Sequence, residues 1–144
     1  MHLLIVEVIA LMGPSGSGKT TLLNVLGGRA LSNTTGEIFI NGKRFDKTMR
    51  KQIAYVMQED IFFTNLTVKE QLTFTSQLRL PETVSVIDKA AAVDNVIKTL
   101  AIKKCEDTQI CLVSGGEKKR CNIGTELLTN PSVMLLDEPT SGIQ

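Results

Sequence analysis

The pattern of apolar residues along this chain changes near residue 60, from short apolar runs to stripes at helical spacing. Before that point the apolar runs are short, which predicts buried strands at 8–12 and 53–57. Residues 36–42 alternate between apolar and polar and end in Asn-Gly, which is typical of a hairpin. Residues 21–26 predict a short helix that two glycines close.

Further along, the pattern predicts helices that are marked by their first turns. Thr67 and Glu70 have the spacing of a capping box, so a helix should start at Val68. It should end near Leu80, because Pro81 cannot continue it.

A second amphipathic helix is predicted after Ser85. Its apolar residues recur at helical spacing, and both helical stripes are best explained as core packing. These residues are Val86, Ala90, Val93, Ile97 and Leu100. The helices predict a helical subdomain at 61–112, inserted into a core made by 1–60 and 113–144.

A third helix and a last strand complete the pattern. Ser114 and Glu117 form another capping box, and the helix should run toward Leu128 before Asn130-Pro131 stops it. Residues 133–136 then read as a buried strand. The expected fold class is α/β, with a mostly parallel sheet, an antiparallel edge and the helical insertion.

Composition narrows the class of protein. The 144 residues are 42% hydrophobic, as in a globular domain, and a net charge of +1 gives no electrostatic footprint for nucleic acid. Three cysteines without a CxxC pair, and a single histidine, argue against zinc and against a disulfide framework. No run approaches the length of a membrane span, so we expect none in this chain itself.

Candidate chemistry begins at 13–20, a GxxxxGK[ST] phosphate-binding loop placed between a predicted strand and a predicted helix. Its residues are Gly13, Pro14, Ser15, Gly16, Ser17, Gly18, Lys19 and Thr20. Glycines let backbone N–H groups turn inward around an anion. Lys19 would reach the β- and γ-phosphates and the Thr20 hydroxyl would bind Mg²⁺, whereas an ordinary Gly/Ser turn is the simpler alternative.

Two acids come directly after the last predicted strand. Asp137 can hold Mg²⁺ through water, and Glu138 can polarise an attacking water molecule. Many strands end in an acid, but after a phosphate loop this pattern points to nucleotide hydrolysis. A phosphate-loop kinase is an alternative that lacks a basic lid segment here.

The order of these features resembles that of the ABC ATPases. The loop at 13–20 looks like Walker A, Gln58 like the Q-loop, Ser114-Gly115-Gly116-Glu117 like the signature, and 135–142 like Walker B with its adjoining Pro-Thr-Ser-Gly. Glutamate at 117 and the basic run after it resemble subfamily G, the White–Brown-complex type of half-transporter.

The resemblance implies a mechanism and partners. ATP would lie between the 13–20 loop, with Thr21, of one nucleotide-binding domain and the 114–117 signature of a second one, in a homo- or heterodimer. Gln58 would join Thr20 and Asp137 at Mg²⁺, and catalysis would rest on Glu138, Gln58 and Lys19. A transmembrane domain would place the chain at the cytoplasmic face of a membrane, exporting a lipid, sterol, hormone or xenobiotic.

Departures from the family pattern lead to a further expectation. The family's switch histidine, final strands and membrane domain have no counterpart up to Gln144, and neither does its first, aromatic-bearing strand. We therefore expect a partial domain, truncated at both ends, that binds nucleotide without hydrolysing it alone. A soluble ABC-type regulator is the alternative, while a DNA-repair ATPase would need a longer insertion after Gln58.

Overall fold

The structure is a computed structural model that describes residues 8–29, 34–40, 42–46, 48–59 and 61–140. Its α-helices are α1 (Lys19–Leu26), α2 (Val68–Arg79), α3 (Val86–Thr99) and α4 (Gly115–Leu127). Its strands are β1 (Phe39–Ile40), β2 (Lys43–Arg44), β3 (Ile53–Val56) and β4 (Val133–Leu136), and short 3₁₀ turns lie at Met49–Gln52, Lys103–Cys105 and Ile110–Leu112. None of the described helices is long and apolar enough to cross a membrane.

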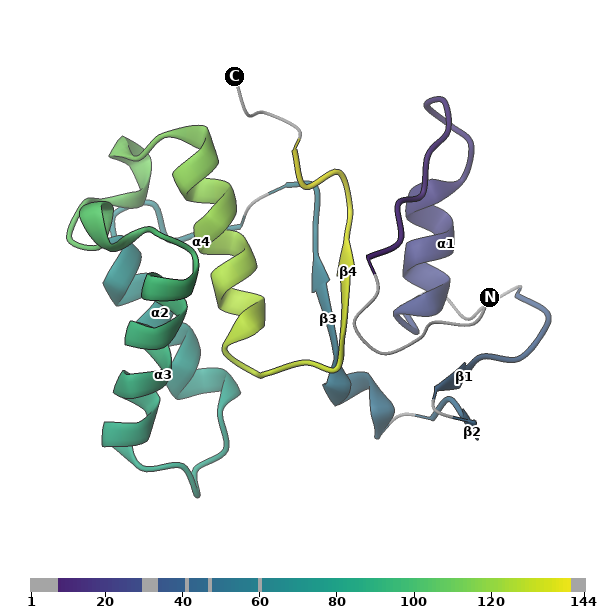
Figure 1. The fold of residues 1–144 in the computed structure, drawn as a ribbon, viewed down its shortest axis with the longest axis horizontal. Helices are drawn as coiled ribbons and strands as arrows, with labels where there is room; N and C mark the ends of the chain where they lie inside the picture. The colour runs from purple at the N-terminus through teal and green to yellow at the C-terminus, as the bar shows by residue number, and fades with distance from the viewer. Residues whose placement is uncertain (1–7, 30–33, 41, 47, 60, 141–144) are drawn as a thin grey trace.

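The strands β3 and β4 form a parallel pair at the centre of the molecule. Figure 1 shows them between α1 on one side and α4 on the other, with α2 and α3 beyond α4. Their register runs from Ile53 opposite Val133 to Val56 opposite Leu136. Since parallel strands need a long crossover, the whole helical segment lies between them in sequence. Both strands consequently end at the same edge.

Local signals account for the helices. The Thr67 hydroxyl accepts a hydrogen bond from the Glu70 N–H, and the Glu70 carboxylate accepts one from the Thr67 N–H, as the capping box predicts. Ser85 likewise caps α3 through the N–H of Asp88. The predicted bounds of α2, α3 and α4 agree with the structure to within a residue or two.

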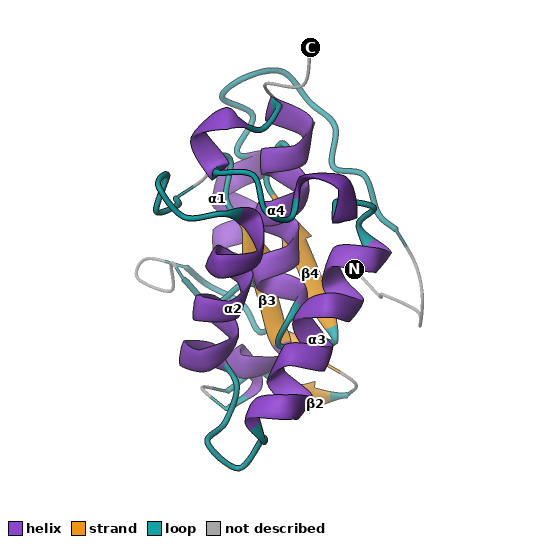
Figure 2. Cartoon of the chain, turned by 90° about the vertical axis from the view of Figure 1, so that its left-hand side faces the viewer, coloured by secondary structure: helices purple, strands orange, loops and turns teal. Residues whose placement is uncertain are grey.

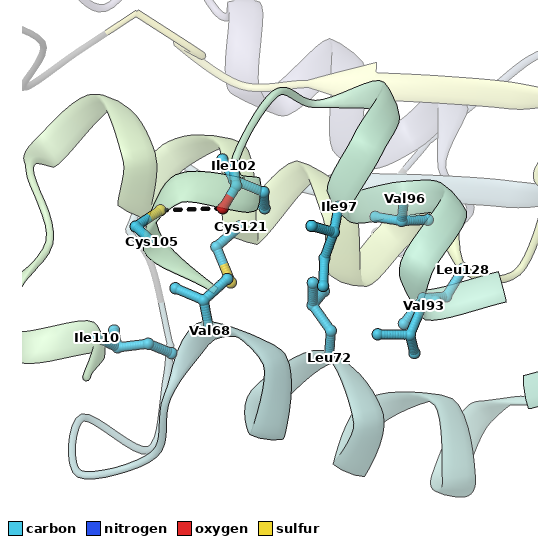
Figure 3. Close-up of a cluster of buried hydrophobic side chains, with 10 residues drawn as sticks. All are labelled: Val68, Leu72, Val93, Val96, Ile97, Ile102, Cys105, Ile110, Cys121 and Leu128. Carbon is cyan, nitrogen blue, oxygen red and sulfur yellow. Dashed lines mark hydrogen bonds between the residues drawn. The ribbon is translucent and has the colours of Figure 1, made fainter. Parts of the chain in front are cut away.

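A cluster of buried apolar side chains holds α2, α3 and α4 together. Figure 3 shows Val68 and Leu72 pointing from α2 toward Ile97 of α3 and Cys121 of α4. Gly124 lets the helices approach closely, because a Cβ there would lie 3.0 Å from Val96 and 3.1 Å from Leu100. In Figure 2 these helices face the viewer and the strands lie behind them.

The prediction of a strand at residues 8–12 is wrong, because this segment has no regular secondary structure. Val8 and Met12 are 101% and 91% exposed, and none of the described backbone hydrogen bonds outside helices and strands involves 8–12. An apolar run marks a tendency to be buried, whereas a strand also needs an edge to pair with. The predicted hairpin is present as the antiparallel β1–β2 pair, although Asn41 of its turn lies outside the described residues.

The helical cluster generates a stability prediction. Leu72 is fully buried and Leu78, on the same helix, is 70% exposed. Leu72→Ala should lower the free energy of unfolding by about 2–5 kcal/mol, because it removes methyl groups and leaves a cavity. Leu78→Ala, the matched control, should change it by less than about 0.5 kcal/mol. Urea unfolding checks both, and equal losses would mean that the cluster is not the stabilising core.

Candidate functional site

The predicted phosphate loop has the backbone that such a loop requires. Gly16 and Gly18 have φ values of 78° and 87°, in the left-handed region that favours glycine. Gly18 immediately precedes α1, so the loop ends at a helix amino terminus, where the dipole favours anions. The Lys19 ammonium donates to the carbonyl oxygens of Gly13 and Pro14, at 2.9 Å each, and so lies against the loop it belongs to.

The loop meets the end of β4 through a direct contact. The Thr20 hydroxyl donates a hydrogen bond of 3.1 Å to Oδ1 of Asp137, which is 5% exposed. These two predicted metal ligands are 117 positions apart in sequence. A hydroxyl and a carboxylate are hard oxygen donors of the kind that Mg²⁺ takes in phosphate sites. The residues present therefore fit the predicted magnesium ion.

The other oxygen of Asp137 has a partner that the sequence did not reveal. The Tyr55 hydroxyl donates to Oδ2 of Asp137 at 3.4 Å, and the Arg29 guanidinium lies 4.2 Å from the centre of the tyrosine ring. Burial raises the pKa of Tyr55, and the Asp137 charge raises it further while Arg29 opposes this. Tyr55 looked like one more apolar strand residue, so no sequence signal marked it.

Gln58 and Glu138 meet beside this contact. The Gln58 amide donates to the Glu138 carboxylate at 2.8 Å, and both side chains are exposed. Glu138 has a φ of 46°, a conformation that a non-glycine residue adopts at a cost and that is common at functional sites. Thus four predicted site residues, Thr20, Gln58, Asp137 and Glu138, gather at the carboxyl ends of β3 and β4.

The predicted signature segment begins α4. Ser114 caps the helix, and Glu117 returns the capping bond to the Ser114 N–H at 3.0 Å. Hydrogen bonds from the Ser114 hydroxyl and N–H, with Lys104 nearby, lower the pKa of Glu117 to about 2. Among the described residues, no hydrogen bond or ion pair joins 114–117 to 13–20.

A second residue that the sequence analysis missed lies further along the same helix. Lys119 is 3% exposed, and its ammonium donates to the carbonyl oxygens of Met57 and Gln58. The basic run at 118–120 resembled subfamily G, but nothing in its spacing distinguished the buried lysine from its neighbours. Only the packing of α4 against β3 shows which of them points inward.

Comparisons with known proteins show which family the sequence resembles. A family model described as ABC transporter matches residues 2–141. ABC transporter G family member 22 of Arabidopsis thaliana is 50% identical over 143 residues, which is 95% of this chain and 19% of that protein. Member 14 of the same plant is 46% identical over 142 residues, covering 95% of this chain and 22% of that protein. Member 1 of Dictyostelium discoideum is 43% identical over 144 residues, covering 94% and 18%.

The chain thus spans about a fifth of the length of these relatives. The similarity extends over nearly the whole chain, so it includes the phosphate loop, the segment that begins α4 and the two acids after β4. The resemblance to subfamily G that the motifs indicated is confirmed.

Tyr55 offers a direct test of its contact with Asp137. It is the one tyrosine in the chain, so ultraviolet absorbance reports its titration alone. The midpoint of the tyrosine titration should lie above the ordinary pKa of 10.0. Asp137→Asn should lower this midpoint but should not return it to 10.0, because burial is the larger cause of the shift. Because the raised pKa favours the neutral tyrosine in the folded state, the contribution of Tyr55 to folding stability should be fully present below pH 10.0. It should be lost as the pH rises through the folded pKa of Tyr55.

The matched control is Asp107→Asn, which changes an exposed carboxylate elsewhere and should leave the midpoint unchanged. A midpoint that is the same in wild type and in Asp137→Asn would contradict the contact between the tyrosine and the Asp137 carboxylate.

Proposed function

The chain belongs to the ABC transporter family, in subfamily G, and from this we propose that it binds ATP with Mg²⁺ as the motor domain of a membrane transporter. The observation that carries the proposal is the contact of Thr20 with Asp137 at 3.1 Å. It joins a phosphate-binding loop to a carboxylate at the end of a buried strand, and this pairing is what phosphate-loop nucleotide hydrolysis uses.

Each part of the loop has a role in binding. The N–H groups of 13–20 and the amino end of α1 would surround the β- and γ-phosphates, with Thr21 on the first turn. Lys19 already lies against the loop, and its ammonium would turn from the carbonyls of Gly13 and Pro14 to the phosphates. Thr20, Asp137 and Gln58 would hold Mg²⁺, which when bound offsets the charge of the phosphate oxygens.

Hydrolysis needs a group that orients water, and Glu138 is our candidate. Its carboxylate follows the proposed magnesium ligand directly and is held by the Gln58 amide at 2.8 Å. A carboxylate in that position can accept a proton from water as it attacks the γ-phosphate. The hydrogen bond gives Gln58 a part in orienting Glu138 as well as in holding the metal.

A second nucleotide-binding domain would complete the site. The amino terminus of α1 would already contact the phosphates of the nucleotide bound to its own chain. The amino terminus of α4 would then contact the nucleotide of a second copy, from the opposite side. Its residues are Ser114, Gly115, Gly116 and Glu117. The lack of any described bond between 114–117 and 13–20 within the chain is consistent with such an arrangement between two copies.

The surface that comes after Gln58 in sequence supports a membrane partner. Four of the six residues that line a groove there are apolar, and exposed apolar surface can mark an interaction site. The residues that line it are Phe62, Phe63, Thr64, Asn65, Leu66 and Phe74. We propose that a transmembrane domain contacts this face from the cytoplasmic side, and that the whole protein exports a lipid, sterol, hormone or xenobiotic.

The binding half of the proposal rests on Lys19. Lys19→Ala removes a cation from the phosphates and should weaken ATP binding about ten- to a hundredfold, as is typical for a hydrogen bond to a charged group. Lys43→Ala, an exposed lysine of β2, is the control and should bind ATP like wild type. Titration calorimetry on the chain measures this, and equal affinities for Lys19→Ala and wild type would refute the assignment of the loop.

The catalytic half rests on Glu138 and needs an assembled transporter. We would exchange this chain for the corresponding segment of ABC transporter G family member 22. In that chimera Glu138→Gln keeps an oxygen for the Gln58 amide but loses the base, so ATP should still bind while hydrolysis falls about a hundredfold or more. Glu59→Gln is the control, and steady-state hydrolysis that survives Glu138→Gln would assign the base to another residue.

A further inference from the structure

Lys119 joins α4 to the segment that carries Gln58. Its side chain is 3% exposed, and its ammonium lies 3.1 Å from the carbonyl oxygen of Met57 and 3.0 Å from that of Gln58. These are the first two residues after β3. A buried ammonium is costly unless its protons are hydrogen-bonded, and here it satisfies two carbonyls that β3 no longer pairs.

Gln58 is therefore held at two points. Its main chain is fixed by Lys119, and its side-chain amide donates to Glu138 at 2.8 Å. Five residues before Lys119 on the same chain lies Ser114, the cap of α4. A rigid helix thus connects the segment proposed to bind the nucleotide of a second copy with the residue proposed to bind Mg²⁺ in the first.

We propose that Lys119 is a positioning residue that sets Gln58 at the metal and couples it to α4, an inference that rests on the proposed function. It touches neither nucleotide nor metal and acts through the backbone of Gln58. When Lys119 is in place, Gln58 is ready to bind the metal without first being ordered. When the ammonium is lost, the two carbonyls lose a partner and Gln58 must be ordered at each binding event, at a cost in entropy.

The chain supplies a matched control in Lys89. This lysine is 5% exposed and its ammonium donates to the carbonyl oxygen of Leu80, at 3.3 Å, just after the end of α2. It has the same chemistry and similar burial as Lys119, but it joins α3 to α2 and not to Gln58. A purely structural effect of losing a buried lysine should therefore occur in both variants.

The experiment measures ATP affinity of the 144-residue chain by calorimetry, once with Mg²⁺ and once with EDTA. Lys119→Met should weaken binding about tenfold with Mg²⁺, the size expected when the support of a metal ligand is lost, and leave binding in EDTA unchanged. Lys119→Arg keeps a donor and should restore most of the affinity. Lys89→Met should lower the melting temperature and leave both affinities as in wild type.

A double-mutant cycle adds a readout that a structural role would not produce. In the Gln58→Ala background, Lys119→Met should cause no further loss of affinity with Mg²⁺, because its effect passes through Gln58. If Lys119→Met does not fold, Lys119→Gln replaces it, with a shorter neutral side chain and the same expected results.

The outcomes separate this inference from the proposed function. A wild type that binds ATP more tightly with Mg²⁺, together with a Lys119→Met variant that matches it, would overturn the positioning role alone. Equal losses with Mg²⁺ and EDTA, or additive losses in the double mutant, would also overturn it. A wild type that binds no ATP, or binds it equally with and without Mg²⁺, would overturn the proposed metal site itself.

Discussion

The site depends on the parallel pairing of β3 with β4, because that pairing brings Asp137 to the phosphate loop. The register ends with Val56 opposite Leu136, and the Asp137 N–H then donates to the Val56 carbonyl at 3.0 Å. This bond extends the pairing by one step, so the Asp137 carboxylate lies where Thr20 and Tyr55 can reach it. A slip by one residue would turn the side chain to the opposite face.

The long crossover between the two strands is made stable by the helical cluster. Cys121 of α4 and Leu128, the residue directly after it, pack with residues of α2 and α3. Arg79 of α2 makes a paired salt bridge with Glu126 of α4. Because α4 also contacts β3, this helix connects the packed helices to the carboxyl end of β3, where Gln58 lies. The boundary of a separate helical subdomain at 61–112 stays a prediction.

The sequence predicted best those features that are local. Capping boxes at Thr67 and Ser114 act within four residues, so the starts of α2 and α4 could be stated in advance. The loop geometry and the two acids were found from motifs whose spacing has a chemical reason. The strand at 8–12 failed, and Tyr55 and Lys119 were missed, because pairing edges and buried contacts are set by tertiary packing that a single sequence does not display.

The most direct test is an NMR titration of the chain with ATP and Mn²⁺, a paramagnetic ion that accepts the same oxygen ligands as Mg²⁺. If the site is as described, the backbone signals of Thr20, Gln58 and Asp137 should broaden when both are present. The broadening should weaken with distance from these three residues. Broadening centred elsewhere, or broadening by Mn²⁺ that ATP does not increase, would contradict the account.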